Sequence, residues 1–196
     1  KRMIFFGLGE SQVETLLRDA AARAKQQGVR IGYRAQRALI EVNLKGANPA
    51  LQTIQGQVLE RLGPWLVAED DESFMERLAR RLIEASATVS VAESCTAGPV
   101  RARLTDLSGS PRYFREGDRT SSNDAKERLL GVSRRALEAH GAVSPEVATQ
   151  MALGAKERSA ATYALAISGI AGPTGGTDTK PVGTVDFALA APEGVY

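Results

Sequence analysis

The stretch Val91-Ala92-Glu93-Ser94-Cys95-Thr96-Ala97-Gly98 decides the fold of the larger part of this chain. An apolar strand runs into small polar residues, and the pattern predicts that a helix begins near Thr96. In an α/β sheet, ligands bind at the carboxyl ends of the strands, where the free N–H groups of a helix can hold an anion. Ser94 and Cys95 are therefore both candidate nucleophiles. Taken alone, the pattern favours a simpler role, in which Ser94 or Thr96 caps the helix.

Strands and helices alternate on both sides of this stretch. The predicted elements are a helix over 73–87, a strand over 88–92, helices over 123–130 and 145–159, and strands over 163–167 and 182–190. Such alternation predicts a three-layer α/β/α domain with a largely parallel sheet.

Residues 1–68 have a different order of predicted elements. The predicted strands span 3–6, 29–35, 38–44 and 65–68, and the predicted helices span 10–27 and 49–62. The order βαββαβ predicts a small α+β domain. This part carries ten Lys/Arg and five Asp/Glu, and the acidic run Glu69-Asp70-Asp71-Glu72 follows it. We therefore predict two domains, 1–68 and 69–196.

Composition excludes several classes of protein. The 196 residues carry a net charge of +2, with 43% hydrophobic and 24% charged residues, which is typical of a globular chain. A transmembrane helix needs a longer apolar run than the sequence contains. One cysteine and one histidine leave no internal disulfide, no cysteine-based zinc site and little scope for histidine catalysis. Because the chain starts at Lys1 without a signal pattern and stops in a strand-like pattern, we expect a fragment of a longer cytoplasmic protein.

Two further segments are candidates for a site. Lys126, in the first turn of the helix predicted after Ser122, can act as a base if the helix dipole or burial lowers its pKa. Spacing alone favours a solvated lysine paired with Asp124 or Glu127. The glycine-rich segment 168–177 follows a strand and allows backbone amides to approach a ligand, although it can equally be a mobile turn. Lys180, just beyond it, can meet a phosphate or face water.

Several motifs in fixed order resemble one family. They are Ala92-Glu93-Ser94-Cys95-Thr96, Arg103-Leu104-Thr105-Asp106, Gly109-Ser110, Tyr113-Phe114, Ser122-Asn123-x-Ala125-Lys126, Leu130-Gly131-Val132, His140-Gly141-Ala142-Val143-Ser144, Ser168-Gly169-Ile170-Ala171-Gly172-Pro173-x-Gly175-Gly176 and Lys180-Pro181-Val182-Gly183-Thr184-Val185. Residues 73–196 resemble the CinA C-terminal domain, the nicotinamide mononucleotide (NMN) deamidase family. Residues 1–68, with Phe6-Gly7-Leu8-Gly9-Glu10-Ser11, resemble the KH-like middle domain of full-length CinA.

The resemblance implies a Ser/Lys amidohydrolase of pyridine nucleotide salvage, which converts NMN and water to nicotinic acid mononucleotide and ammonia without a metal or cofactor. It implies Ser94 as nucleophile and Lys126 as general base. We expect amides at the helix start near Thr96 to form the oxyanion site. The substrate-binding residues that we expect are Thr96, Asn123, Ser168, Gly169, Gly172, Gly175, Gly176 and Thr177. We also expect a cytoplasmic homodimer without membrane contact.

This chain departs from the family pattern at 116–122. Asp118 and Arg119 replace expected buried residues, and burying these charges unpaired would be costly. Ser121 replaces a family tyrosine, and the family's terminal arginine-containing segment lies beyond Tyr196. The alternative is therefore a catalytically impaired nucleotide-binding or scaffold member of the family. Nucleic-acid binding by residues 1–68 is a weaker alternative, since a Gly-x-x-Gly loop is missing from their sequence.

Overall fold

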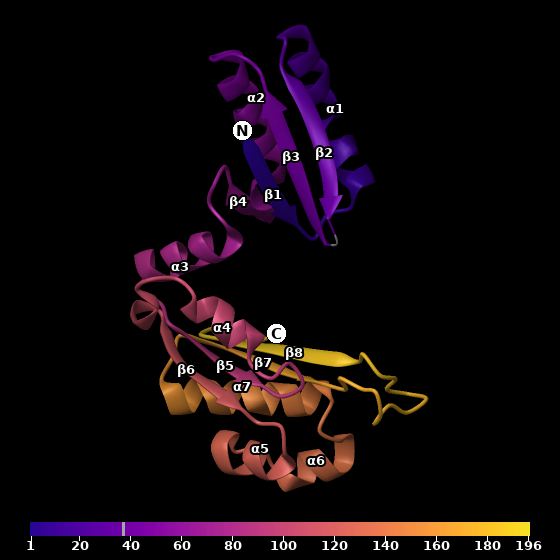
Figure 1. Cartoon of the computed structure of the whole chain (residues 1–196), viewed down its shortest axis with the longest axis vertical. Coiled ribbons are helices and arrows are strands. Elements are labelled where there is room, and N and C mark those ends of the chain that lie inside the picture. Colours follow the sequence, from indigo (N-terminus) through magenta and orange to yellow (C-terminus); the bar gives the residue numbers. More distant parts are fainter. Residues whose placement is uncertain (37) are drawn as a thin grey trace. The chain divides into compact units, whose positions relative to one another are not determined.

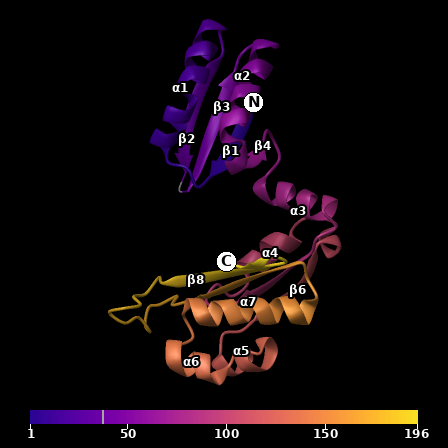
Figure 2. The same cartoon turned by 180° about the vertical axis from the view of Figure 1, so that it is seen from behind.

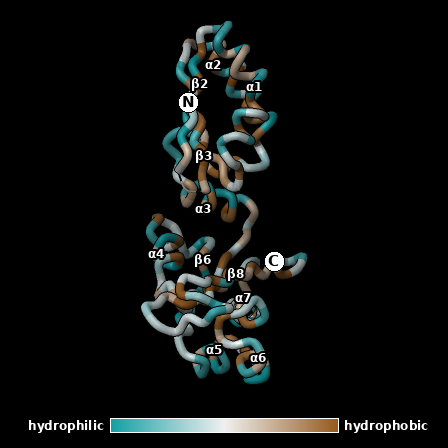
Figure 3. Tube along the Cα trace, turned by 90° about the vertical axis from the view of Figure 1, so that its right-hand side faces the viewer, coloured by the Kyte–Doolittle hydropathy of each residue, from teal (hydrophilic) through white to brown (hydrophobic). Residues whose placement is uncertain are grey.

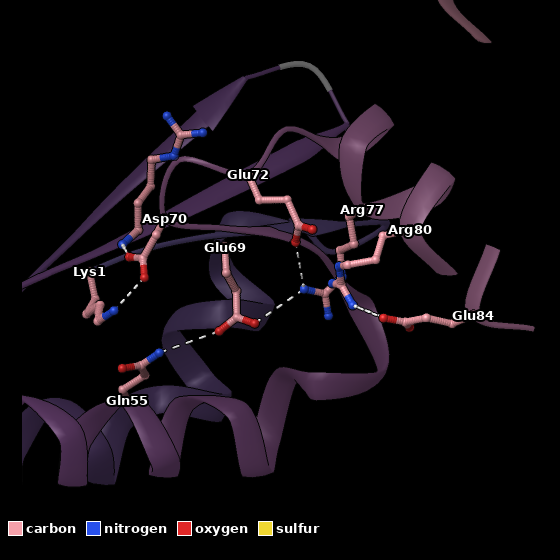
Figure 4. A network of polar contacts seen from close by, with 9 residues as sticks. Lys1, Gln55, Glu69, Asp70, Glu72, Arg77, Arg80 and Glu84 are labelled. Atoms are coloured by element: carbon pink, nitrogen blue, oxygen red, sulfur yellow. Dashed lines mark hydrogen bonds and ion pairs between the residues drawn. The ribbon is translucent and has the colours of Figure 1, made fainter. Parts of the chain in front are cut away.

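The computed structural model describes residues 1–36 and 38–196, and it divides into two units, Lys1–Arg77 and Leu78–Tyr196 (Figure 1). The division falls within helix α3 (Phe74–Glu84), whereas the sequence places it between residues 68 and 69. Two ion pairs join the start of α3 to the smaller unit. Arg77 Nη1 lies 3.3 Å from Glu69 Oε2 and 3.6 Å from Glu72 Oε2 (Figure 4), which ties the first turn of α3 to the smaller unit.

The smaller unit is a four-stranded antiparallel sheet with two helices on one face. Its elements are β1 (Arg2–Phe6), α1 (Glu10–Gln26), β2 (Arg30–Gln36), β3 (Leu39–Lys45), α2 (Ala50–Leu62), the 3-10 turn η1 (Gly63–Trp65) and β4 (Leu66–Glu69). The strand order is β2-β3-β1-β4. Alternate strand residues such as Met3 and Phe5 share a core with Val13 of α1 and Ile54 of α2. Hydrophobic and hydrophilic residues both recur along α1, as one buried helix face requires (Figure 3). The βαββαβ prediction is confirmed.

The larger unit is built on a mixed sheet. Its elements after α3 are β5 (Val89–Glu93), α4 (Pro99–Thr105), the 3-10 turn η2 (Ser110–Arg112), β6 (Phe114–Arg119), α5 (Asn123–Leu130), α6 (Arg134–His140), α7 (Pro145–Ser159), β7 (Tyr163–Gly169), β8 (Val185–Ala191) and β9 (Gly194–Val195). The strand order is β6-β5-β7-β8-β9, in which β5 runs parallel to both β6 and β7. The last two strands are antiparallel to their neighbours.

Helices cover both faces of this sheet. Helix α7 lies along one face and α4 on the other, and both views show this layering (Figures 1 and 2). Met151 and Ala152 of α7 pack against Ala92, Ala166 and similar small residues of the strands. The predicted three-layer domain with a parallel sheet core is confirmed. Within the described residues, no helix has the length and apolar character needed to span a membrane.

Three parallel strands end side by side at the carboxyl end of the sheet, called its carboxyl edge below. Glu93 at the end of β5 pairs with Arg119 of β6 and with Ile167 of β7. The next residues of the chain are Ser94, Thr120 and Ser168. The three segments that the sequence singles out therefore leave the sheet at the same edge, where α/β folds bind ligands.

The predicted helix start at this end of the sheet is wrong, and the charges at 118 and 119 prove compatible with the fold. The helix after Ser94 begins at Pro99, because Ala97 (φ 61°) and Gly98 (φ 121°) first turn the chain through left-handed conformations. The charge of Asp118 is also not buried unpaired. Its side chain is 11% exposed and its Oδ1 lies 3.2 Å from Arg158 of α7. Arg119 is exposed, so its charge stays in contact with water.

Candidate functional site

Ser94 and Lys126 meet at the carboxyl edge of the sheet. Lys126 Nζ lies 3.0 Å from Ser94 Oγ and 2.7 Å from the carbonyl oxygen of Thr120. The backbone N–H of Ser94 donates to the carbonyl of Ile167 over 3.0 Å, which fixes the serine against β7. Helix α5 begins at Asn123 because the Ser122 side chain accepts the N–H of Ala125 over 3.1 Å. That cap places Lys126 in the first turn of α5, facing β5.

The environment of Lys126 favours its neutral form. The side chain is only 1% exposed, and this burial lowers the pKa of Lys126 below its ordinary value of 10.5. The adjacent Cys95 side chain acts more weakly and raises the pKa of Lys126. A neutral amine can donate one N–H to Thr120 and use its lone pair to accept the proton of Ser94.

A solvated, ion-paired Lys126 is not what the structure contains. Asp124 lies 3.7 Å from Arg128, and Glu127 lies 3.2 Å from Arg134. Across 1–36 and 38–196, Lys126 forms no ion pair with a carboxylate. Only hydrogen bonds compensate its burial, and this arrangement is typical of lysines whose charge is suppressed.

The turn after Ser94 is held by Glu93. The Glu93 carboxylate is 2% exposed and accepts the Thr96 hydroxyl over 2.6 Å. It also accepts the N–H groups of Val100 over 3.3 Å and Arg101 over 2.9 Å, at the start of α4. The first amides of α4 cannot bind an oxyanion, because Glu93 already accepts their hydrogen bonds. The predicted role of amides near Thr96 therefore concerns the turn before α4 and stays a prediction.

Free donors lie instead in the turn itself. The backbone N–H groups of Cys95 and Thr96 make no hydrogen bond to any residue that the structure describes, whereas Ala97 closes the tight turn that begins at Ser94. Successive amides in a turn that includes a left-handed residue form a concave, anion-binding arrangement. Ala97, with φ of 61°, is such a residue. The unpaired donors directly follow the Ser94 hydroxyl in the chain.

The glycine-rich segment approaches the pair at its first glycine. A Cβ on Gly169 would lie 2.8 Å from Cys95 Sγ and 2.7 Å from the carbonyl oxygen of Thr184, so the position admits only glycine. The Ser168 hydroxyl is buried and donates to the carbonyl of Ala142 over 2.7 Å. Ser168 therefore links β7 to the chain between α6 and α7.

The far end of this segment is held by Lys180. Its Nζ donates to the carbonyl oxygens of His140 over 2.8 Å and Val143 over 2.6 Å. His140 is the last residue of α6, so the lysine charge lies at the negative end of a helix. Lys180 thus neither faces water alone nor is left free for a phosphate.

The structure separates the other expected binding residues into two groups. Asn123, at the start of α5, is exposed near Lys126, and Gly172 packs against Val182. Gly175, Gly176 and Thr177 lie in an exposed turn. There the Thr177 hydroxyl accepts the backbone N–H of Lys180 over 3.0 Å. Gly175, Gly176 and Thr177 are thus held by contacts with neighbouring residues of the same loop.

Sequence reasoning missed two residues of this site. Thr120 is fully buried, and its carbonyl accepts the Lys126 amine, while its own hydroxyl has no partner among the described residues. No sequence signal marks a backbone carbonyl. Glu93 carried a signal, since a carboxylate at the end of an apolar strand must find partners in the fold.

Comparison with known proteins now decides the family. A family model described as the CinA C-terminal domain matches residues 71–196. The chain belongs to the CinA family. It is 45% identical to a CinA-like protein of Geobacter sp. (strain M21) over 188 residues, 94% of this chain and 45% of that protein. It is 42% identical to a CinA-like protein of Shewanella baltica (strain OS155) over 200 residues, 100% of this chain and 46% of that protein. The chain spans a little under half the length of these CinA relatives.

Solved CinA structures match about two thirds of this chain. The competence/damage inducible protein CihA from Agrobacterium tumefaciens superposes with a TM-score of 0.59 at 44% identity, over 66% of this chain and 81% of that chain. A CinA superfamily protein from Escherichia coli superposes with a TM-score of 0.61 at 38% identity, over 66% and 78% of the two chains. At these identities the fold and the family both carry over.

Proposed function

We propose that this CinA-family chain is an amidohydrolase that converts nicotinamide mononucleotide and water to nicotinic acid mononucleotide and ammonia. Ser94 is the nucleophile and Lys126 is the general base. The observation that carries the proposal is the 3.0 Å contact between Lys126 Nζ and Ser94 Oγ, made by a lysine that is 1% exposed. A serine needs a base within hydrogen-bond reach, and a lysine serves only when it is neutral.

The first half of the reaction forms an acyl-enzyme. Lys126 takes the hydroxyl proton of Ser94 while Oγ attacks the carboxamide carbon of the substrate. The resulting oxyanion accepts hydrogen bonds from the free amides of Cys95 and Thr96. When the tetrahedral intermediate collapses, the carbon–nitrogen bond breaks and the proton on Lys126 passes to the leaving nitrogen. Ammonia departs, and the nicotinoyl group remains as an ester on Ser94.

The second half repeats the same proton movements with water. Lys126, neutral again, removes a proton from a water molecule as that water attacks the ester carbon. The carbon–oxygen bond to Ser94 then breaks, and the serine regains its proton from Lys126. Nicotinic acid mononucleotide is released as the carboxylic acid, which ionises in solution. Lys126 thus serves twice as base and twice as acid, so its pKa has to lie nearer the working pH than an exposed lysine's.

Substrate recognition is assigned to the loops that follow β7 and β6. Gly169 allows the segment 169–177 to approach Cys95 closely, and backbone amides of such a loop suit a phosphate or ribose. Asn123 is exposed beside the pair and is able to donate to the carboxamide oxygen or accept from its nitrogen. Thr96 is assigned a supporting role, because its hydroxyl is committed to Glu93.

The test is ammonia release from NMN by the purified chain. Wild-type protein is expected to release one ammonia for each nicotinic acid mononucleotide formed. Ser94→Ala and Lys126→Met are each expected to lower kcat by at least about a thousandfold. Asp124→Asn, which changes an exposed carboxylate in the same helical turn, is the matched control and retains activity. Calorimetric binding of NMN without turnover would instead favour the impaired, nucleotide-binding alternative.

A further inference from the structure

Glu93 is the most deeply buried carboxylate near the site, and the proton transfers proposed above do not use it. It is 2% exposed at the last position of β5, directly before Ser94. Its Oε2 accepts the Thr96 hydroxyl over 2.6 Å and the Val100 N–H over 3.3 Å. Its Oε1 accepts the Arg101 N–H over 2.9 Å. One side chain therefore bridges the strand, the turn and the start of α4.

These contacts determine the path of the chain between β5 and α4. Ala97 and Gly98 both adopt positive φ, which for an alanine costs about 1 kcal/mol or more and persists only when the surroundings enforce it. The Thr96 hydroxyl is pulled back onto Glu93, and the α4 amides are drawn toward the same carboxylate. Among the residues that the structure describes, the amides of Cys95 and Thr96 are left without a partner.

A simple helix cap would give a different result. With a serine or threonine cap at residue 94 or 96, the turn amides would become the first amides of the helix, and the cap hydroxyl would bond to them. The Ser94 hydroxyl is instead available to Lys126, because Glu93 satisfies the amides of α4 in its place. The carboxylate thus separates the capping of α4 from the presentation of Ser94.

We propose that Glu93 is the positioning residue of the Ser94–Lys126 pair: its buried carboxylate holds the 94–98 turn so that the Ser94 hydroxyl faces Lys126 and the amides of Cys95 and Thr96 stay free. The inference rests on the proposed function only in taking Ser94 as a nucleophile. It requires neither that NMN is the substrate nor that Glu93 touches any ligand.

The test measures the reactivity of Ser94 directly, with a fluorophosphonate probe on the purified chain. Ser94 Oγ displaces fluoride from the probe's phosphorus, and the serine proton passes through Lys126 to solvent. Glu93→Gln keeps the shape of the side chain and its bond to Arg101, but it sets an amide donor against the Val100 N–H. Thr96→Val removes the hydroxyl donor at nearly constant volume. Each is expected to slow labelling about tenfold, and Glu93→Ala about a hundredfold.

The matched control is Ser90→Ala on the same strand. Ser90 is buried, and its hydroxyl donates to the carbonyl of Ala155 over 3.3 Å, away from the turn. Its loss is expected to lower the thermal midpoint about as much as Glu93→Gln while leaving the labelling rate at the wild-type value. In the Glu93 variants that fold, the pH midpoint of labelling is expected to stay where it is in wild type, because that midpoint reports Lys126.

The outcomes are distinct. If Glu93→Gln and Thr96→Val label as fast as Ser90→Ala while their thermal midpoints fall, Glu93 only stabilises the fold and the positioning role is overturned. These two variants decide the question even if Glu93→Ala does not fold. Wild-type labelling without NMN turnover refutes the substrate and leaves the positioning role supported or refuted by the variants. A wild-type protein that is labelled no faster than Ser94→Ala refutes both proposals.

Discussion

Replacing Gly154 with alanine tests the packing that holds Lys126 in place. Gly154 lies inside α7, and a Cβ built there would be 1.8 Å from the carbonyl oxygen of Leu130 and 2.6 Å from its carbonyl carbon. Leu130 is the last residue of α5, one helical turn after Lys126. Both partners in the contact are backbone, so neither can yield by changing a rotamer.

The sign of the effect depends on which of two contributions is larger. Helix propensity alone favours alanine over glycine by about 1 kcal/mol. Against it, the end of α5 would have to retreat by about 1.6 Å to restore an ordinary contact, starting from the 1.8 Å separation. Overpacking of this kind costs about 3 kcal/mol. We therefore expect a net destabilisation of about 2 kcal/mol.

The same displacement reaches the site. Lys126 is carried by α5, and its Nζ lies 3.0 Å from Ser94 Oγ in the wild-type structure. A shift of about 1 Å or more removes that hydrogen bond, and misplacement on this scale can lower kcat about a hundredfold. Gly154→Ala is thus expected to lose both stability and activity without any change to a residue of the pair.

Chemical unfolding in urea, followed by circular dichroism, measures the free energy of unfolding. Gly56→Ala in α2 is the matched control, because Gly56 also lies inside a helix but a Cβ there would have no neighbour within 4 Å. It is expected to gain about 0.5–1 kcal/mol. If Gly154→Ala proves as stable as wild type, the packing of α5 on α7 and the resulting placement of Lys126 are wrong.

Three further predictions concern charges. The kcat/KM for NMN is expected to rise with pH to a plateau through a midpoint below 10.5, because only neutral Lys126 accepts a proton; a pH–rate profile that falls over pH 6–9 contradicts this. Burial raises the pKa of Asp118 despite the opposing charge of Arg158. Between pH 3.8 and the raised pKa, the folded state therefore binds more protons than the unfolded state. The free energy of unfolding consequently falls as the pH rises through that interval. Asp118→Asn is therefore expected to be more stable than wild type at pH 7, with the difference closing below pH 3.8 in urea titrations. Lys180→Met removes the donor to two carbonyls and is expected to raise KM for NMN more than it lowers kcat, measured by steady-state ammonia release.

Local patterns made much of the architecture predictable. The starts of α5 and α7 follow from Ser122 and Ser144, each of which caps its helix by accepting an N–H three residues later. The alternation of strands and helices identified the sheet, and the family motifs identified Ser94 and Lys126. These features are predictable because caps, turns and hydrophobic periodicity depend on residues three or four positions apart.

The start of α4 was not predictable in this way. Small polar residues at 94–96 suit a helix cap, yet Glu93 satisfies the amides of a helix that begins at Pro99. The sequence allowed two acceptors for the first amides of the helix, a hydroxyl at 94–96 or the carboxylate of Glu93. The choice depends on Glu93, which becomes buried only when β5 enters the sheet. Local rules cannot rank alternatives whose energies differ through burial.

The sequence by itself determined the family, the order of elements and the residues able to act as nucleophile and base. Only the tertiary structure decided that Lys126 contacts Ser94, 32 residues away, and that Asp118 finds Arg158 on α7. The lowered pKa of Lys126 belongs to this second group. The physical reason is the same throughout. A hydrated side chain keeps its usual pKa and bonds to water, and both change only when distant segments pack around it and replace that water.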